Sequence, residues 1–249
     1  MTEADAQLAR RIADVAGQLL LTLRSAGLCE GKDLGKMGDR VANAFIMETL
    51  RHHRPHDGIL SEEEKNERTH LGKKRVWIVD PLDGTREYGE AGRTDWAVHI
   101  ALAIDGRAEV GAVALPALPE TFSTDKPSAI VPPGNGPLRM LVSRTRPATE
   151  AVEVAKLLKA ELVPMGSAGA KAMAVVRNEA DIYLHSGGQY EWDSCAPVAV
   201  AQACGFHVSR IDGSPLVYNR EDPYLPDLLI CRKEHAATVL DLIKEIGPT

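Results

Sequence analysis

Aromatic residues are scarce in this chain of 249 residues, at 4% of the composition. The sequence also lacks a long apolar run, a low-complexity tract and an internal repeat, which argues against a membrane-spanning helix and against a repeat architecture. Positive charge is not in excess, because 29 Lys and Arg against 35 Asp and Glu give a net charge of −6. No basic field therefore attracts nucleic acid polymers, and any anionic ligand must be held by local cations.

Cysteine is also sparse. The four cysteines, at positions 29, 195, 204 and 231, form no C-x-x-C zinc or redox motif. Reduced thiols in a cytoplasmic protein are the expectation, with Cys195 a small packed residue whose redox role is left open. The N-terminal stretch has acids early and no basic start before an apolar core, so it does not resemble a secretory signal.

What the sequence does have is a globular composition, 44% hydrophobic and 26% charged. In the first half, apolar residues at helical spacing predict an opening amphipathic helix, and a second helix is predicted over 38–53. Strands are predicted over 58–60, 75–80, 96–104 and 108–116, the last two joined at Asp105-Gly106, a strong hairpin signal. We therefore expect two helices followed by a largely antiparallel sheet.

The stretch 127–137 is rich in proline and glycine and is the predicted linker. Beyond it, strand-like and helix-like segments alternate, including a predicted helix over 194–204. This alternation predicts a layered α/β fold. We expect an N-terminal α+β metal-binding half, 1–126, and a C-terminal α/β half, 138–249, that closes the active site.

A short acidic turn, W-I-V-D-P-L-D-G-T-R-E-Y, carries the chemistry of the first half. Asp80 and Asp83 follow a buried strand, and the acids Glu62 to Glu64 end an earlier one. Carboxylates brought together repel unless a cation is present, and oxygen ligands favour Mg²⁺ or Mn²⁺. The carbonyl of Leu82 could add an oxygen. The simpler alternative is a tight turn whose aspartates bond local amides.

The same turn continues with a glycine and a hydroxyl. Gly84 allows a close backbone approach, and the amides of Gly84 and Thr85 could receive a phosphate oxygen. The Thr85 hydroxyl could orient or deprotonate an attacking water. In the second half, Asp193 stands before an apolar helix, where an aspartate is an ordinary N-cap.

The combination S-E-E-E, D-P-L-D-G-T-R-E-Y, G-S-A-G-A-K and E-W-D-S-C-A-P resembles the inositol monophosphatase superfamily of metal-dependent, lithium-sensitive phosphatases, over essentially the whole chain. The resemblance implies that family's sugar phosphatase fold, with alternating αβαβα layers. It implies two or three Mg²⁺ ions per site, and a metal-activated water that attacks a phosphomonoester. The metal ligands that it implies are Glu63, Asp80, Leu82 through its carbonyl, Asp83 and Asp193.

Further roles follow from the resemblance alone. Glu62 is the second choice as ligand, Asp39 falls near the nucleophilic water or a third metal, and Thr85 activates that water. Before the second helix the family has D-x-S-P-V-T-x-A-D, whereas this chain has K-D-L-G-K-M-G-D. The threonine that would flank Asp39 is therefore missing.

A basic residue, a glutamate and an aromatic after D-G-T resemble the bisphosphate nucleotidase branch of the superfamily. That branch implies removal of the 3′-phosphate of 3′-phosphoadenosine 5′-phosphate, a nucleotide recycled in sulfate assimilation. The alternatives are inositol monophosphatase or fructose-1,6-bisphosphatase activity and, more remotely, a non-catalytic phosphate or nucleotide sensor. A small phosphate ester is the expected partner, a homodimer is allowed, and the expected substrate contacts are Gly84, Thr85, Arg86, Ser143, Arg144 and Lys171.

Overall fold

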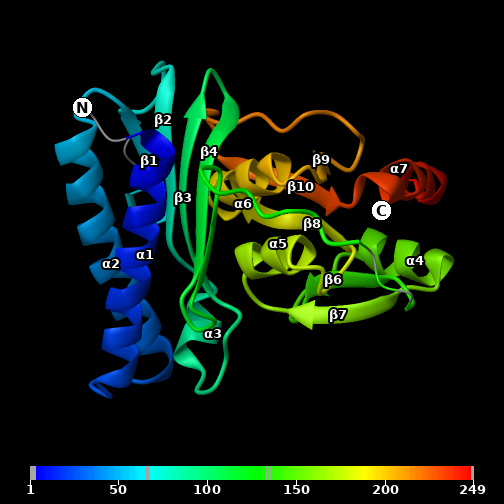
Figure 1. The fold of residues 1–249 in the computed structure, drawn as a ribbon, viewed down its shortest axis with the longest axis horizontal. Coiled ribbons are helices and arrows are strands. Elements are labelled where there is room, and N and C mark those ends of the chain that lie inside the picture. Colours follow the sequence, from blue (N-terminus) through cyan, green and yellow to red (C-terminus); the bar gives the residue numbers. More distant parts are fainter. Residues whose placement is uncertain (1–3, 65–67, 133, 135, 248–249) are drawn as a thin grey trace.

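The computed structural model describes residues 4–64, 68–132, 134 and 136–247. These residues form five alternating layers of helices and sheets (Figure 1). The order is a helix pair, a sheet, a second helix pair, a second sheet and a third helix pair. The predicted αβαβα layering is confirmed.

The first sheet has the strand order β1-β2-β3-β4-β5. Its strands are β1 (Gly58–Ser61), β2 (Arg75–Asp83), β3 (Ala97–Ile104), β4 (Arg107–Leu115) and β5 (Glu120–Ser123). Only β1 and β2 run parallel, and the other pairs are antiparallel. The largely antiparallel sheet and the hairpin at Asp105-Gly106 were both predicted correctly.

Helices α1 (Asp5–Ser25) and α2 (Gly31–His53) cover the outer face of this sheet. Successive side chains of β2 pack into two different hydrophobic cores, one on each face of the sheet, because a strand presents alternate residues to opposite faces. Trp77 packs toward α1 and α2, whereas Ile78 packs toward the second half. The strand is apolar almost throughout because both faces of the sheet are covered.

The second sheet has the order β7-β6-β8-β10-β9. Its strands are β6 (Arg139–Ser143), β7 (Glu161–Met165), β8 (Ile182–Tyr190), β9 (His207–Ser209) and β10 (Tyr224–Cys231). Strand β6 pairs in parallel with β7 and β8, whereas β10 is antiparallel to β8 and β9.

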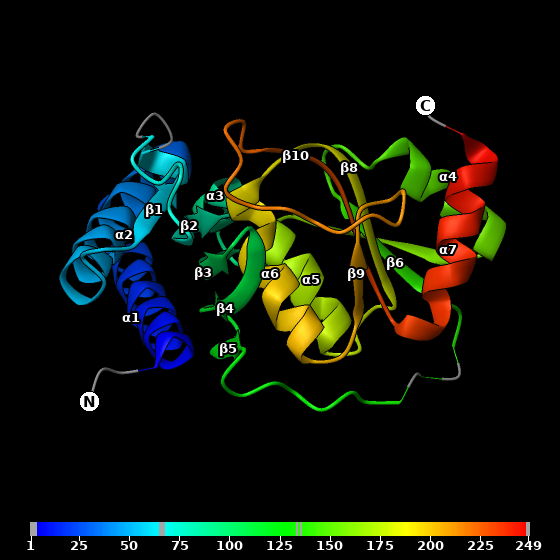
Figure 2. The same cartoon turned by 90° about the horizontal axis from the view of Figure 1, so that it is seen from above.

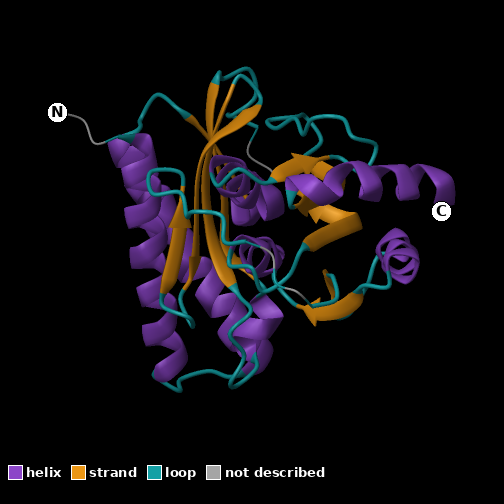
Figure 3. Ribbon diagram, turned by 45° about the vertical axis from the view of Figure 1, so that its right-hand side comes forward, coloured by secondary structure: helices purple, strands orange, loops and turns teal. Residues whose placement is uncertain are grey.

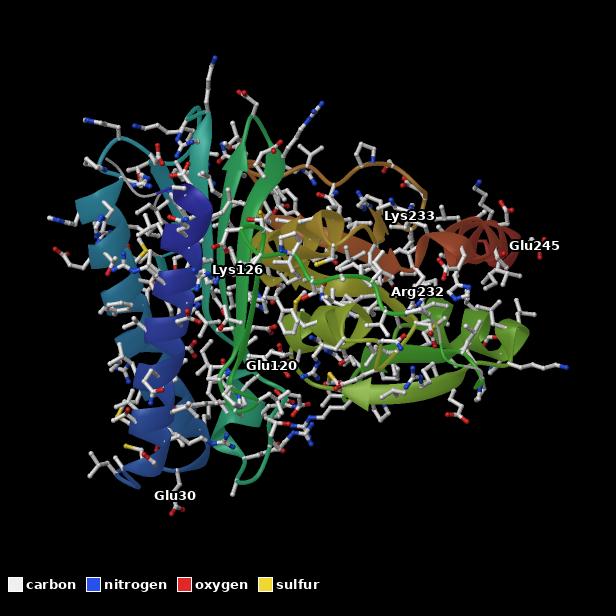
Figure 4. All side chains as sticks on the ribbon, viewed as in Figure 1. Glu30, Glu120, Lys126, Arg232, Lys233 and Glu245 are labelled. Atoms are coloured by element: carbon white, nitrogen blue, oxygen red, sulfur yellow. The ribbon has the colours of Figure 1, made fainter. Side chains whose placement is uncertain are left out.

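Helices α5 (Ala168–Val176) and α6 (Glu191–Ala203) lie between the two sheets, and α4 (Thr149–Leu158) and α7 (Lys233–Ile246) cover the outer face of the second sheet (Figures 1 and 3). Side chains fill the spaces between the layers, while charged residues such as Glu30 and Glu245 point outward (Figure 4). Among the described residues, no helix is long and apolar enough to cross a membrane.

Strand β2 continues to Asp83, so it contains both acids of the turn that were expected to follow it, and the starts of two helices also differ from the prediction. Helix α2 begins at Gly31 rather than at residue 38, so K-D-L-G-K-M-G-D is helical. Glycines lower helix propensity, but Leu34, Gly35 and Gly38 are buried against neighbouring elements, and this packing outweighs the propensity. Helix α6 begins at Glu191 rather than at Ser194, directly after β8.

The predicted linker, 127–137, contains no helix or strand among its described residues, and positions 133 and 135 lie outside them. Figure 2 shows the segment after β5 running along the outside of the molecule toward the second sheet. The division into halves 1–126 and 138–249 stays a prediction.

Candidate active site

The acidic turn lies where β2 leaves the sheet. Its pairing with β3 shifts between Asp80 and Asp83, at Pro81, which has no N–H for the ladder. The amide of Leu82 donates to Oδ1 of Asp80 at 3.0 Å, and the carbonyl of Leu82 lies 3.1 Å from the Thr85 hydroxyl. One oxygen of Asp80 thus bonds a local amide, as the simpler alternative expected. The other acid, Asp83, has different partners.

Three carboxylates meet at this turn. Oxygens of Asp80, Asp83 and Asp193 all lie within 4.8 Å of one another. Burial, with the negative charge of Glu62 next, raises the pKa of Asp80 well above its usual range. Burial and the charge of Asp83 raise the pKa of Asp193 to about 7. Ionising all three together is therefore costly unless a cation offsets the repulsion.

Asp83 differs from Asp80 and Asp193, because hydrogen-bond donors surround its carboxylate. Burial disfavours its charge, but His99 and the donors of Ser167 and Gly169 outweigh burial and lower the pKa of this carboxyl. Its Oδ2 accepts from the Ser167 hydroxyl at 2.5 Å and from the Gly169 amide at 2.7 Å, and lies 3.3 Å from Nε2 of His99. The other ring nitrogen of His99 lies 3.1 Å from the carbonyl of Trp192.

Sequence reasoning missed His99, Ser167 and Gly169. A Cβ added at Gly169 would lie 2.0 Å from Nε2 of His99, so only glycine lets α5 approach Asp83 this closely. A signal existed for His99, which is the one polar residue of the strand A-V-H-I-A-L-A-I and is fully buried. Ser167 and Gly169 belong to G-S-A-G-A-K, one of the motifs behind the family resemblance, but neither residue was assigned a role there.

Asp39 and Thr85 are brought together by α2 and α3 (Thr85–Gly89). The Thr85 hydroxyl lies 3.2 Å from Oδ2 of Asp39. Burial, followed by the charges of Glu62 and Glu63, raises the pKa of Asp39 to about 8. Its Oδ1 is buried and has no hydrogen-bond partner among the described residues. The structure thus pairs the two residues that the resemblance placed near the attacking water.

The three glutamates form a single turn of 3₁₀ helix, Glu62–Glu64, and their side chains differ in exposure and in partners. Glu62 is half-buried; its charge is the largest cause after burial of the raised pKa of Asp80, and it adds a smaller contribution to the raised pKa of Asp193, where burial and Asp83 come first. Glu63 is exposed. Glu64 accepts from Asn43 at 3.0 Å. Glu62 is thus less exposed than Glu63, and its charge affects two members of the aspartate cluster.

Asp193 occupies the third position of α6, not the cap before it. Its Oδ2 accepts the backbone N–H of Tyr190, the residue before the helix, at 2.6 Å. Pro197 lies in the second turn of α6. Because proline has no N–H, the helical bond to the carbonyl of Asp193 cannot form. Cys195 is a fully buried free thiol, as expected of a small packed residue.

A cavity of about 300 Å³ opens beside Asp83. It is lined by Asp83, Gly84, Thr85, Arg86, Glu87, Ser143, Arg144, Thr145, Arg146, Gly166 and Ser167. Gly84 has φ +87°, and an added Cβ would lie 3.2 Å from the carbonyl of Asp95, so both conformation and space require glycine. Five of the expected substrate contacts, Gly84, Thr85, Arg86, Ser143 and Arg144, line this cavity.

Arg144 reaches from the end of β6 to the first half. Its Nε donates to Glu87 at 2.5 Å and its Nη2 donates to Glu90 at 2.6 Å. These hydrogen bonds, to Glu90 and then Glu87, raise the pKa of Arg144 above its usual range. Two carboxylates therefore offset the charge of the cation that was expected to contact substrate.

Lys171 does not line the cavity. Its ammonium is buried, donates to the carbonyls of Gly166 and Ser167, and lies 5.2 Å from the centre of the Tyr183 ring. Burial lowers its pKa to about 8, although nearby carboxylates, Asp83 first, oppose that effect. Lys171 is thus tied to the loop that holds Asp83.

Known proteins are similar to this chain in sequence and in fold. A 3′-phosphoadenosine 5′-phosphate phosphatase of Mycobacterium leprae is 50% identical over 255 aligned residues, 97% of this chain and 94% of the relative. The 3′(2′),5′-bisphosphate nucleotidase CysQ of Escherichia coli K12 is 28% identical, over 90% of this chain and 96% of the relative. The structure of an inositol monophosphatase from Anabaena superposes with a TM-score of 0.76 at 21% identity, covering 98% of this chain and 96% of that one. The profile of the inositol monophosphatase family matches residues 1–247, so the layered fold and the acidic turn together identify the chain as a member of the inositol monophosphatase family.

Proposed function

We propose that this protein is a metal-dependent phosphomonoesterase that removes the 3′-phosphate of 3′-phosphoadenosine 5′-phosphate. The observation that carries the proposal is the cluster of three aspartates, Asp80 and Asp83 buried and Asp193 partly buried, at the edge of a polar cavity. The function named for the relative of 50% identity agrees with it. The same function was predicted from the residues after D-G-T.

The aspartate cluster suits a hard divalent cation. All of its donors are oxygens, which fits Mg²⁺ or Mn²⁺ better than zinc. The raised pKa values of Asp80 and Asp193 and the unpartnered Oδ1 of Asp39 mark negative charge that the described residues leave uncompensated. We propose Asp80, Asp83, Asp193 and the carbonyl of Leu82 as ligands, at a site for two or three ions.

The glutamate ligand is assigned differently from the sequence-based prediction. We propose Glu62, because its charge acts on both Asp80 and Asp193, whereas the side chain of Glu63 is exposed. Replacing each with Gln tests the choice. Glu62→Gln should weaken Mg²⁺ activation much more than Glu63→Gln, and the reverse result would restore Glu63.

The bound cation would neutralise phosphate oxygens and acidify water, and this chain's residues position and deprotonate the nucleophile. Thr85, hydrogen-bonded to Asp39, is placed to orient the attacking water. Burial, followed by the charges of Glu62 and Glu63, raises the pKa of Asp39 to about 8 in the metal-free site, so this carboxyl would accept a proton near neutral pH once bound cations lower that pKa. Ser167, Gly169 and the His99 ring fix Asp83, so its free oxygen keeps one orientation.

The remaining predicted contacts have different roles in this proposal. Gly84 and Arg86 adjoin Thr85 in the cavity wall and would contact the reacting phosphate, and Ser143 lines the same cavity from the end of β6. We assign Lys171 a structural role, because backbone carbonyls already hold its ammonium. Arg144 connects the halves through Glu87 and Glu90.

A phosphate-release assay over three substrates tests the function. 3′-Phosphoadenosine 5′-phosphate, inositol 1-phosphate and fructose 1,6-bisphosphate would be compared in Mg²⁺ and in EDTA. We expect the highest kcat/KM for the nucleotide and no turnover in EDTA. A preference for either sugar phosphate would favour the sibling activities, and binding of the nucleotide without phosphate release would favour a sensor.

The cellular setting is part of the same proposal. Four free cysteines fit a reducing cytoplasm, and a small phosphate ester, not a nucleic acid polymer, is the expected partner. The homodimer stays a prediction, to be checked by sedimentation velocity.

A further inference from the structure

The cavity wall carries three arginines, Arg86, Arg144 and Arg146, and their charges are not equally available. Arg144 is held by Glu87 and Glu90. Within the described residues, neither Arg86 nor Arg146 has a carboxylate at ion-pair distance. An incoming anion therefore finds Arg144 already neutralised and the other two arginines uncompensated.

The two uncompensated arginines come from different halves of the chain. Arg86 directly follows Thr85 in α3, beside the place of the reacting phosphate. Arg146 belongs to the loop after β6, in the second half of the chain. A second phosphate on the same ligand lies several ångströms from the first and needs a cation away from α3, and Arg146, which lines the same cavity from the second half of the chain, can supply it.

Arg146 lies between the Ser143 hydroxyl and the backbone at Gly188. Its own amide donates to the Ser143 hydroxyl at 3.2 Å. Its guanidinium lies against Gly188, where an added Cβ would be 3.2 Å from Nη1. Gly188 has φ +75°, and its amide donates to the Tyr224 hydroxyl at 3.2 Å. The missing side chain at Gly188 leaves the guanidinium room beside the cavity.

We propose that Arg146 binds the phosphate that the enzyme does not remove, which is the 5′-phosphate of the nucleotide. This inference rests on the proposed function and names the residue that would set its specificity. A planar guanidinium can donate two parallel hydrogen bonds to a phosphate, and such charge-assisted bonds are among the stronger ones. Arg146 touches only the distal group, so it contributes to binding and not to phosphate transfer.

The test compares 3′-phosphoadenosine 5′-phosphate, called the bisphosphate below, with adenosine 3′-phosphate, which lacks the distal 5′-phosphate. For Arg146→Ala we expect kcat/KM on the bisphosphate to fall about 10- to 100-fold, mainly through KM. The same variant should change kcat/KM on adenosine 3′-phosphate less than about twofold, and Arg146→Lys should restore part of the loss. Inhibition by adenosine 5′-phosphate, which keeps the distal phosphate, should weaken by a similar factor.

Arg107→Ala is the matched control. Arg107 is exposed at the β3–β4 hairpin, at the opposite end of β3 from Asp83. The substitution removes the same charge from the same acidic protein, so it corrects for the general electrostatic attraction of a bisphosphate. Both substrates should be processed as by the wild type.

A second pair of variants moves the guanidinium without removing it. Gly188→Asn adds bulk at Arg146, whereas Gly187→Asn adds it where nothing lies within 4 Å. Both glycines have similar positive φ values, +75° and +76°, which asparagine tolerates better than most residues. Only Gly188→Asn should raise KM for the bisphosphate.

Each outcome is decisive. An equal loss on both substrates, or no loss on the bisphosphate, overturns the role of Arg146 while leaving the phosphatase function intact. If Arg86→Ala, and not Arg146→Ala, separates the substrates, the distal phosphate lies on the α3 wall and the inference is wrong. A wild-type enzyme that hydrolyses inositol 1-phosphate but neither nucleotide overturns the proposed function itself.

Discussion

Two conservative substitutions in the site, Asp39→Asn and Asp83→Asn, should change the stability of the metal-free protein in opposite directions. Asp39 is 8% exposed, and burial is the main cause of its raised pKa. Asp83 has a lowered pKa, because hydrogen bonds and His99 outweigh its burial. Both changes replace a carboxylate with an amide of nearly the same shape, so a difference in sign reports on charge and hydrogen bonding.

The magnitude for Asp39 follows from proton linkage. At pH 7 the folded carboxyl, with a pKa of about 8, is mostly protonated, whereas the unfolded one, at 3.8, is ionised. The gap from 3.8 to pH 7 corresponds to at most about 4 kcal/mol of lost stability. Relaxation and water penetration reduce this bound, so we expect Asp39→Asn to gain about 1–2 kcal/mol, or roughly 2–8 °C in Tm.

The pH dependence separates charge from packing. Because the folded state binds the proton more tightly, the destabilising effect of Asp39 is absent below 3.8 and grows as pH rises toward 8. At pH 5 the upper limit on the stability lost through Asp39 is about 1.6 kcal/mol, so the stability advantage of Asp39→Asn should be less than half of its value at pH 7. Asp83 behaves oppositely, since its stabilising effect is present above the ordinary pKa and lost on acidification.

The assay is thermal unfolding of EDTA-treated protein at pH 5 and pH 7. Asp83→Asn should lose about 1–3 kcal/mol at pH 7, because an amide cannot satisfy all the donors that point at the carboxylate. Asp241→Asn, on exposed α7, serves as the control. If Asp39→Asn gains nothing, or gains equally at both pH values, the charge argument is refuted. Both site variants should lose at least about 100-fold in kcat.

Three further predictions follow. LiCl should inhibit turnover more than KCl at matched ionic strength, since a small oxygen-lined site admits Li⁺; equal inhibition would argue for another site architecture. Gly169→Ala should lower both Tm and activity, because its Cβ would overlap His99, whereas Gly136→Ala, which faces open space, should change neither. Arg144→Ala should cost about 1–2 kcal/mol in a denaturant titration, because it leaves the buried carboxylate of Glu87 without its partner. It should also lower kcat/KM by one common factor on bisphosphate and monophosphate, and a selective loss on the bisphosphate would return Arg144 to substrate recognition.

The layered fold was predictable because its signals are local. A strand buried on both faces is apolar throughout, and a hairpin with Asp-Gly at its turn is read from neighbouring residues. The start of α2 was not predictable in this way. Its early glycines read as a loop, and only packing against α3 and α1 explains why they are helical.

In the candidate site, too, the residues with a local sequence signal were predictable, and those that depend on tertiary packing were not. Asp80 and Asp83 could be found because they lie three positions apart in one short motif, and Asp193 because it belongs to a second recognisable motif. The choice of Glu62 over Glu63 depends on how a single 3₁₀ turn is oriented, which no spacing specifies. The roles of His99 and Gly169 arise only when β3 and α5, distant in sequence, come to lie side by side.

The aspartate cluster takes two members from the end of β2 and one from the start of α6, more than a hundred positions later. During synthesis, Asp80 and Asp83 leave the ribosome long before Asp193 exists. Under the proposed ligand assignment, the nascent first half would offer a cation only part of its coordination, and full affinity would require α6 to be packed against β2 and β3. Metal loading would then be a late event that reports the docking of α6 on the first sheet.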